Sequence, residues 1–248
     1  MATRQGREGI GIRYRLIVLR MEMKEKGMLF DEWPEKYERW LTTSTGALVK
    51  KYEGELLLEL LQPRPGEFIL DAGCGTGIFT LDLLSRGTRV AGLDISLPML
   101  KRAGQKLRGF NFQMVWGDML HLPFLEESFD RVMSVTALEF IEDGRGAFRE
   151  LFRVAKKNGC IVVATLNSLS PWAERRKREA KEKQSIFEKT IFRSPEDMRS
   201  LAPVEGVIRT AVHFQKEDNP QTVVEIEAEG NRKRLATGAL VAGCWKKK

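Results

Sequence analysis

The chain has 248 residues, 42% of them hydrophobic and 30% charged, and this length suits one domain, with or without a cap, that buries a sizeable core. Its three cysteines are isolated from one another, which argues against a disulfide framework and against a structural zinc site. The formal net charge of +7 comes from residues 1–27, 174–183 and 230–248, a pattern that favours solvated tails and a surface helix over its alternative, a polyanion-binding surface.

Residues 1–28 are basic and differ from the rest of the chain. Arginines surround a short apolar core at residues 16–19, which is too short for a signal peptide. No apolar run in the chain approaches the roughly 18 residues that a membrane span needs. We treat residues 1–28 as an N-terminal extension whose composition is compatible with disorder, and we expect a cytoplasmic protein. Methionines within this segment leave open a natural start further downstream.

Residues 29–64 predict an N-terminal helical cap. An amphipathic helix is expected from about Ala47 to Leu61, and the prolines that follow end it. Tyr37 and Trp40 lie just before this helix. These two aromatic side chains can either contact a ligand or simply pack the cap onto a sheet.

The stretch from Phe68 to Thr80 reads F-I-L-D-A-G-C-G-T-G-I-F-T and predicts a strand, a glycine turn and a helix. Its first residues form an apolar run that is typical of a strand buried on both faces. Gly73, Gly75 and Gly77 allow positive φ and leave no Cβ between the backbone and a ligand. The helix that follows would point its free N–H groups at the same ligand. The alternative is that the glycine turn only connects the strand to the helix and binds no ligand.

A second short apolar run, residues 89–93, ends in Asp94, twenty-one residues after Gly73. A carboxylate about 20 residues after the first glycine is placed to accept hydrogen bonds from a ribose diol. A dinucleotide fingerprint reads G-x-G-x-x-G, whereas this chain has G-x-G-x-G with Asp71 two residues before it. A buried carboxylate pairs favourably with cations. The pattern therefore favours a ligand with an ammonium and a sulfonium group over a pyrophosphate.

The run D-A-G-C-G-T-G, residues 71–77, resembles motif I of the class I S-adenosylmethionine (SAM)-dependent methyltransferases, D/E-x-G-x-G-x-G. Residues 37–46 resemble the Y-D-x-W-F-x-T-x-x-G segment of the small-molecule, methyltransferase type 11-like branch, with Glu38 in place of the usual aspartate. The resemblance covers roughly residues 30–246. It implies an α/β fold, with a doubly wound, mostly parallel, seven-stranded Rossmann-like sheet, a reversed edge strand, an N-terminal helical cap and an insertion after strand five.

The resemblance implies a single methyltransferase domain over residues 29–248. We expect its parts to be a helical cap (29–64), a cofactor-binding core (65–167), a substrate-covering insertion (168–203) and late strands (204–248). The expected strands are 68–70, 89–93, 110–116, 129–135, 160–166, 206–215 and 238–245, with a helix over 144–157. Residues 216–234 carry no clear pattern.

SAM is the cofactor that the resemblance implies, with S-adenosylhomocysteine (SAH) as its product and no metal. Asp71 would orient the turn and the ligand's ammonium, Asp94 would hold the ribose, and Asp118 would accept from the adenine amino group. The full expected set is Tyr37, Trp40, Asp71, Ala72, Gly73, Gly75, Gly77, Asp94, Ile95, Met99, Gly117, Asp118, Met119 and Thr136.

The methyl acceptor is expected to lie beside residues 135–139, after the fourth strand. The sequence S-V-T-A-L-E-F there lacks the D/N-P-P-Y/F/W motif of methyltransferases that act on nucleic-acid amino groups, which argues against DNA. No general base is visible. His121 is the one histidine near the site and the weak catalytic candidate, with a surface role as its alternative, while His213 is assigned to a late strand. Aromatic side chains expected near the site favour a partly apolar acceptor. They are Trp33, Trp40, Phe140 and Trp172.

The function expected is methyl transfer by direct displacement to a small molecule. One alternative is an RNA or protein methyltransferase that uses the basic segments, although RNA is the less favoured partner. Another is a non-catalytic cofactor-binding protein, and a nicotinamide dehydrogenase is disfavoured by the glycine spacing. No pattern in the sequence selects the accepting atom or an oligomeric state.

Overall fold

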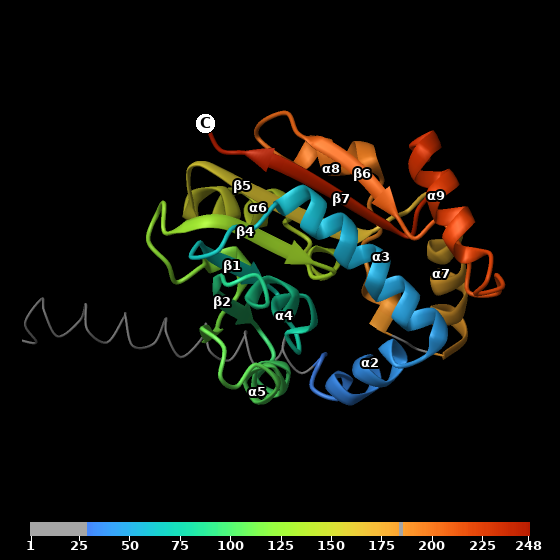
Figure 1. Cartoon of the computed structure of the whole chain (residues 1–248), viewed down its shortest axis with the longest axis horizontal. Coiled ribbons are helices and arrows are strands. Elements are labelled where there is room, and N and C mark those ends of the chain that lie inside the picture. The colour runs from blue at the N-terminus through green and yellow to red at the C-terminus, as the bar shows by residue number, and fades with distance from the viewer. Residues whose placement is uncertain (1–28, 184–185) are drawn as a thin grey trace, which may run out of the picture.

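The computed structural model describes residues 29–183 and 186–248 (Figure 1). The expected N-terminal extension, residues 1–28, lies outside the described residues. The strands are β1 (Phe68–Ala72), β2 (Arg89–Asp94), β3 (Phe112–Trp116), β4 (Phe129–Val135), β5 (Ala155–Leu166), β6 (Val207–Ala211) and β7 (Leu240–Lys246). The helices are α2 (Trp33–Leu41), α3 (Ser44–Leu61), α4 (Ile78–Leu84), α5 (Leu97–Lys106), α6 (Gly144–Val154), α7 (Pro171–Lys183), α8 (Pro195–Leu201) and α9 (Val223–Lys233), with short 3-10 helices η1 (Met119–His121), η2 (Leu138–Phe140) and η3 (Ile186–Lys189).

The strands form one seven-stranded sheet in the order β3-β2-β1-β4-β5-β7-β6. Neighbours from β3 to β5 pair in parallel, and β7 runs antiparallel to both β5 and β6. The predicted fold class is confirmed. The reversed strand is β7, which lies one place inside the edge because β6 pairs along its outer side.

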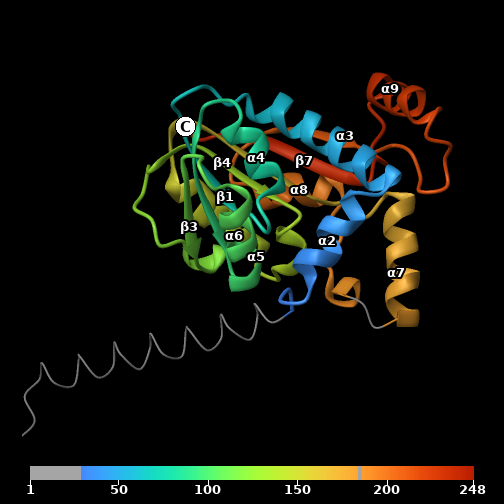
Figure 2. The same cartoon turned by 60° about the horizontal axis from the view of Figure 1, so that its bottom comes forward.

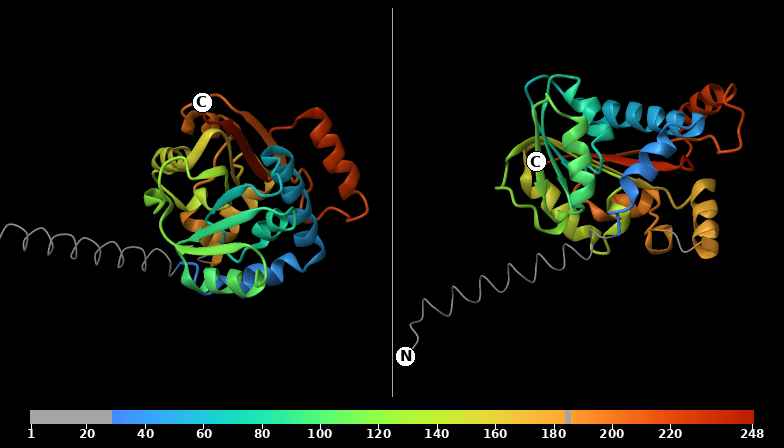
Figure 3. Two further views of the ribbon diagram at one scale, coloured as in Figure 1. Left: turned by 60° about the vertical axis from the view of Figure 1, so that its left-hand side comes forward. Right: turned by 90° about the horizontal axis from the view of Figure 1, so that it is seen from below.

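Helices cover both faces of the sheet (Figures 1 and 3). One buried cluster joins α3, α4 and α5 to the sheet through residues such as Leu57, Leu83 and Leu107. A second cluster on the other face joins η1, α6 and α8 through residues such as Phe148 and Met198. The buried segments of the central strands are largely apolar because both faces are covered, as expected for parallel strands.

Two sequence predictions in the second half of the chain are wrong in detail. The helix expected over 144–157 ends at Val154, because Ala155 is fully buried, adopts an extended conformation and pairs with Phe129 of β4. His213 is not in a strand, since β6 ends at Ala211 and the His213 N–H donates to the Glu227 carboxylate, 2.7 Å away.

The segment without a clear sequence pattern contains α9, which lies at the opposite end of the molecule from β3 (Figure 2). Only a few of its residues, among them Val223 and Glu227, are buried, so a weak apolar repeat is what its packing requires. The insertion between β5 and β6 consists of α7, η3 and α8. Helix α8 begins with a capping box, a reciprocal pair of hydrogen bonds between Ser194 and Asp197.

Candidate active site

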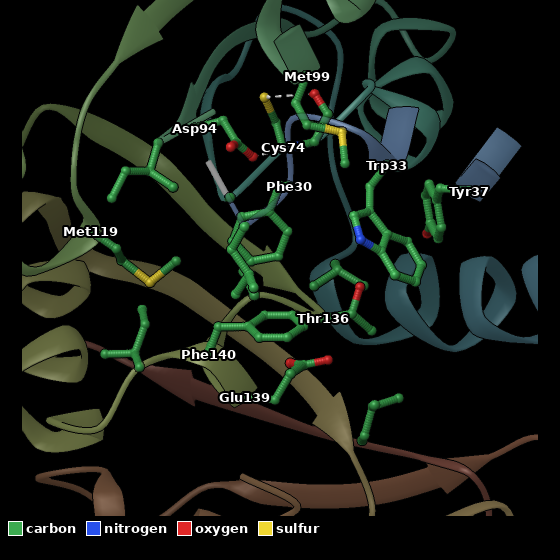
Figure 4. A pocket seen from close by; sticks show the side chains of 18 of the residues that line it. Phe30, Trp33, Tyr37, Cys74, Asp94, Met99, Met119, Thr136, Glu139 and Phe140 are labelled. Atoms are coloured by element: carbon green, nitrogen blue, oxygen red, sulfur yellow. Dashed lines mark hydrogen bonds between the residues drawn. The ribbon is translucent and has the colours of Figure 1, made fainter. Parts of the chain in front are cut away.

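A cavity of about 1230 Å³ lies at the carboxyl ends of β1, β2 and β4, the edge at which open α/β sheets bind ligands (Figure 4). The glycine turn after β1 and the loops after β2 and β3 line one end. Residues of α2, α3, η2, α7 and η3 line the other end. Twelve of the fourteen expected cofactor residues line this cavity, and Ala72 and Gly77 do not.

The glycine turn combines two different requirements. A Cβ on Gly75 would meet no atom within 4 Å, so this residue faces the open cavity with φ of 54°. A Cβ on Gly77 would lie 2.8 Å from the Leu107 Cδ1 atom and 3.3 Å from the Ala103 Cβ atom. Gly77 therefore permits close packing of α5, and it does not line the cavity. Ala72 is fully buried within β1.

Asp94 joins the glycine turn to the loop after β2. Its Oδ2 accepts a 2.8 Å hydrogen bond from the Gly75 N–H, and its Oδ1 accepts one of 2.9 Å from the Ser96 N–H. An ionised carboxylate has about four acceptor positions, so two remain for a ligand hydroxyl pair. Burial raises the pKa of Asp94, opposed by these backbone donors.

Asp71 lies beneath the turn and is 2% exposed. Its Oδ2 accepts a 2.6 Å hydrogen bond from the Thr80 hydroxyl of α4. Burial raises the pKa of Asp71 to about 7, with the Thr80 bond opposing and Asp94 adding to the shift. A cationic ligand group at the turn would favour the ionised form.

A third group of expected residues forms the wall beside β2 and β3. Ile95, Met99, Gly117, Asp118 and Met119 all line the cavity. The Trp116 indole N–H donates to the Ile95 carbonyl at 2.9 Å and so fixes the loop after β2. The wall combines apolar side chains with one carboxylate, which suits an aromatic ring that carries an amino group.

Helix α2 covers the cavity, with Tyr37 and Trp40 among its lining residues. Glu38, on the same helix, forms ion pairs with Arg102 (2.8 Å) and Lys106 (2.5 Å) of α5. We call these three residues the α2–α5 clasp. The glutamate that departs from the family pattern therefore ties the cover to the core.

Two buried acids and one arginine lie at the end of the cavity away from the glycine turn. Glu53 of α3 is 7% exposed and Glu139 of η2 is 1% exposed, and both line the cavity with Arg176 of α7. Tyr37 and Thr136 line the cavity beside them, and Figure 4 shows Tyr37, Thr136 and Glu139 around the same space. We call Glu53, Glu139 and Arg176 the acid–arginine cluster.

Burial controls the protonation of this cluster. It raises the pKa of Glu53 to about 8, with Arg176 opposing the shift and Glu139 adding to it. It raises the pKa of Glu139 to about 7, opposed by a hydrogen bond from Thr165 and by Arg176. It also raises the pKa of the Tyr37 hydroxyl, so that the phenol stays neutral. Both acids therefore exchange protons near neutral pH.

Sequence reasoning missed Glu53 and Arg176, although a signal was present. Glu53 follows Val49 by four residues and precedes Leu57 by four, and both of those residues are buried. Arg176 lies between the buried Trp172 and Ala180 at the same spacing. The expectation that residues 174–183 form a fully solvated helix is wrong for this inward face.

The catalytic candidate His121 is misplaced. It lies in η1, its side chain is exposed, and it does not line the cavity. The expected border residues Val135, Thr136 and Glu139 do line it, as do the aromatic side chains expected there: Trp33, Trp40, Phe140 and Trp172. Phe30 and Phe187 complete the aromatic wall.

Within residues 29–183 and 186–248, no helix is long and apolar enough to cross a membrane. The same part of the chain holds no group of three or more histidine, cysteine, aspartate or glutamate side chains arranged to bind a metal ion.

Comparisons with known proteins agree with this geometry. A family model described as a methyltransferase domain matches residues 70–163. The demethylmenaquinone methyltransferase of Corynebacterium kroppenstedtii is 32% identical over 150 residues, which are 60% of this chain and 63% of that protein. The malonyl-[acyl-carrier protein] O-methyltransferase of Hamiltonella defensa is 34% identical over 120 residues, which are 48% of this chain and 46% of that protein. The chain thus spans about half to two thirds of the length of these relatives.

Among solved structures, a SAM-dependent methyltransferase from Thermotoga maritima, described as a possible histamine N-methyltransferase, superimposes with a TM-score of 0.64. The match covers 90% of this chain and 100% of that chain at 23% sequence identity. At this identity the similarity shows the shared fold.

Proposed function

Because residues 70–163 of this chain belong to the class I SAM-dependent methyltransferase family, we propose that the protein transfers a methyl group from SAM to a small-molecule acceptor by direct displacement. The observation that carries the proposal is the hydrogen bond between Asp94 and the Gly75 N–H at the floor of the cavity. It joins the two parts of the sequence pattern, the glycine turn and the acid after the second strand, in one site.

The residues present fit the cofactor. The space over Gly75 is free of side chains, so the methionyl part of SAM can lie directly on the turn, with its ammonium toward Asp71. The two remaining acceptor positions of Asp94 suit the ribose hydroxyls. Asp118 would accept from the adenine amino group, between the apolar side chains of Ile95 and Met119.

The remaining expected residues follow from this placement. Tyr37 and Trp40 of α2 would close over the methionyl part, and Thr136 would lie at the border between cofactor and acceptor. Met99 and Gly117 would complete the adenine wall. Ala72 and Gly77 would support the turn without contacting the ligand.

The acceptor side of the proposal rests on the size and cover of the cavity. Its volume of about 1230 Å³ exceeds the roughly 300–1000 Å³ of ordinary small-molecule sites, which leaves room for an acceptor beside the cofactor. Bound SAM supplies an activated methyl on its sulfonium, so the chain has to hold the nucleophile in line and exclude water. Helix α2 and the insertion over residues 168–203 would provide that cover.

Calorimetric titration with SAM, SAH and NADH tests this proposal. The expected result is binding of SAM and SAH and no binding of NADH. In Asp94→Asn, loss of the charged hydrogen bonds should weaken SAH binding by about 10- to 100-fold, because such bonds contribute about 1.5–3 kcal/mol. Glu55→Gln, an exposed charge change on α3, is the control and should bind normally.

If neither sulfur ligand binds to the folded protein, the proposed function is wrong. Binding that persists unchanged in Asp94→Asn would instead remove the ribose role of Asp94.

A further inference from the structure

We propose that the acid–arginine cluster is the acceptor subsite and that it takes a small amine: Glu53 and Glu139 bind the ammonium, and Arg176 binds an oxygen atom of the same molecule. This inference rests on the proposed function and names the substrate class of the same site.

Glu53 is a buried acid with no protein partner that explains it. It lies on α3 among buried apolar residues and faces the cavity. None of the hydrogen bonds or ion pairs formed within residues 29–183 and 186–248 involves its carboxyl group. Burying a carboxyl group without a partner is costly. A ligand that supplies the missing hydrogen bonds and charge would account for its position.

The position of Glu139, the second acid of the cluster, is fixed by hydrogen bonds. Its Oε2 accepts a 3.0 Å hydrogen bond from the Thr165 hydroxyl of β5, and its carbonyl accepts from the Ile191 N–H at 2.8 Å. Glu139 lies three residues after Thr136 and lines the same space (Figure 4). The carboxyl therefore has a fixed position beside the border between cofactor and acceptor.

Arg176 does not neutralise the two acids directly. No ion pair within 4.0 Å joins it to Glu53 or Glu139 in the described structure, although its charge acts on both. Its guanidinium carbon lies 5.5 Å from the ring centroid of Trp172 and 5.4 Å from that of Phe187. Its Nη1 is buried and has no hydrogen-bond partner among the described residues. The cavity that these residues line thus contains an unused donor, Arg176 Nη1, and an acid, Glu53, that forms no hydrogen bond or ion pair within the described residues.

The charge balance favours a cationic ligand group next to the acids. When ionised, Glu53 and Glu139 attract an ammonium and repel an anion, while Arg176 offsets part of the charge of both acids and Arg193 part of that of Glu139. Aromatic rings form the walls, with Phe30 and Phe140 in edge contact at 4.9 Å and Trp33 and Phe187 at 6.5 Å. Such rings attract an ammonium through their faces.

Glu139 can also accept the proton that an ammonium must lose before methyl transfer. Glu139, as carboxylate, takes one proton from the acceptor's R–NH₃⁺ and leaves R–NH₂ with a free electron pair. That pair forms the N–CH₃ bond as the C–S bond breaks, and the electrons of the C–S bond stay on sulfur. The products are R–NH₂⁺–CH₃, neutral SAH and protonated Glu139, which returns its proton to water.

Proton release gives a signature that a merely structural cluster would lack. The raised pKa values of Glu53 and Glu139 mean that the free site holds protons near pH 7. A bound ammonium favours both carboxylates, so binding should release protons. The groups that act on the pair are Tyr37 of α2, Thr165 of β5, Arg176 of α7 and Arg193 before α8, and of these the arginines already favour ionisation.

The test is calorimetry on the SAH-saturated protein at pH 7 with three probes of similar shape: 2-phenylethylamine, 2-phenylethanol and 3-phenylpropionate. Titrations in phosphate and in Tris buffer report the protons released. We expect the amine to bind with proton release, and the alcohol and the acid to bind at least about tenfold more weakly with none.

Glu53→Gln and Glu139→Gln keep the side-chain shape and should each weaken amine binding by about tenfold or more and reduce proton release. Glu55→Gln, on the exposed side of α3, is the matched control and should change neither.

Equal binding of amine and alcohol, preferred binding of the acid, or no binding of the amine at millimolar concentration would each overturn the proposal. Because SAH binding is measured first on the same samples, its absence reports failure of the proposed function and not of the acceptor subsite.

Discussion

Asp94 and Asp71 each hold protein groups as well as facing the cavity. Asp94 accepts from two backbone N–H groups, and Asp71 accepts from Thr80. The glycine turn is thus arranged before any ligand arrives, and such pre-organisation lowers the ordering cost of binding.

Exchange of the turn glycines for alanine separates ligand contact from packing. Both Gly75 and Gly77 have positive φ, so each alanine should cost about 1–2 kcal/mol of stability. Gly77→Ala also collides with Leu107 and should lower Tm further. Gly75→Ala places a methyl group in the cavity and should weaken SAH binding more strongly. Thermal unfolding and calorimetry measure the two effects, and a larger loss of SAH affinity in Gly77→Ala would contradict this division.

The residues that the sequence predicted share one property: their spacing along the chain carries the information. Gly73 and Gly75 with Asp94 are recognisable because the turn and the acid belong to one strand–turn–helix–strand unit. Glu53 and Arg176 are not, because their meeting depends on how α3 and α7 pack at the end of the sheet. The prediction for His121 rests on its chemistry alone, with no spacing to support it, and its place in η1 leaves it outside the cavity.

At the level of elements, α2 depends on few contacts for its position over the cavity. None of its residues is fully buried, and the clasp from Glu38 to Arg102 and Lys106 links it to α5. The hydroxyl of Ser96 adds a 3.1 Å hydrogen bond to Asp31, just before α2. Weak local burial with polar ties is typical of covers that open and close.

Glu38→Gln should loosen this cover. Burial opposes ionisation of Glu38, but the hydrogen bonds from Arg102 and Lys106 hold its pKa below the usual range. Exposed ion pairs contribute about 0.2–1 kcal/mol each, so SAH dissociation should become about two- to tenfold faster. Stopped-flow dissociation measures this rate, and added salt should reduce the difference from wild type.

Arg39→Gln, an exposed change on the same helix, is the control and should leave the SAH dissociation rate unchanged. A rate in Glu38→Gln equal to that of wild type would show that the clasp does not hold the cover.

The elements themselves were largely readable from apolar periodicity. The strands and α3 follow it because burial on one or both faces dictates the pattern. The end of α6 could not be predicted from this periodicity, since Ala155 fits a helix locally and only its pairing with β4 makes it a strand residue. In α9 the buried acid Glu227 binds backbone N–H groups of the segment after β6, a contact with no local signal.

For the whole molecule, the buried acids make stability depend on pH. The pKa values of Asp71, Glu53 and Glu139 are about 7, 8 and 7 in the fold, above their values of 3.8, 4.5 and 4.5 in an unfolded chain. The folded state therefore holds protons that the unfolded state has lost. This contribution is fully present below about pH 4 and is lost as pH rises toward 8.

We accordingly expect Tm of the ligand-free protein to fall between pH 5 and pH 8 by at least about 2–4 °C, the change that about 1 kcal/mol produces in a chain of this size. The double variant Glu53→Gln, Glu139→Gln should show a smaller fall, because two of the three groups no longer titrate. Calorimetric scans across this range measure it. A flat profile for wild type, or an equal slope for the variant, would contradict the raised pKa values.

The most direct measurement of the central claim is a crystal structure of the protein with SAH. We predict the ribose hydroxyls at Asp94, the adenine between Ile95 and Met119, and the methionyl part over Gly75, with the sulfur facing Thr136 and the acid–arginine cluster beyond it. SAH bound elsewhere, or with its ribose away from Asp94, would contradict the account.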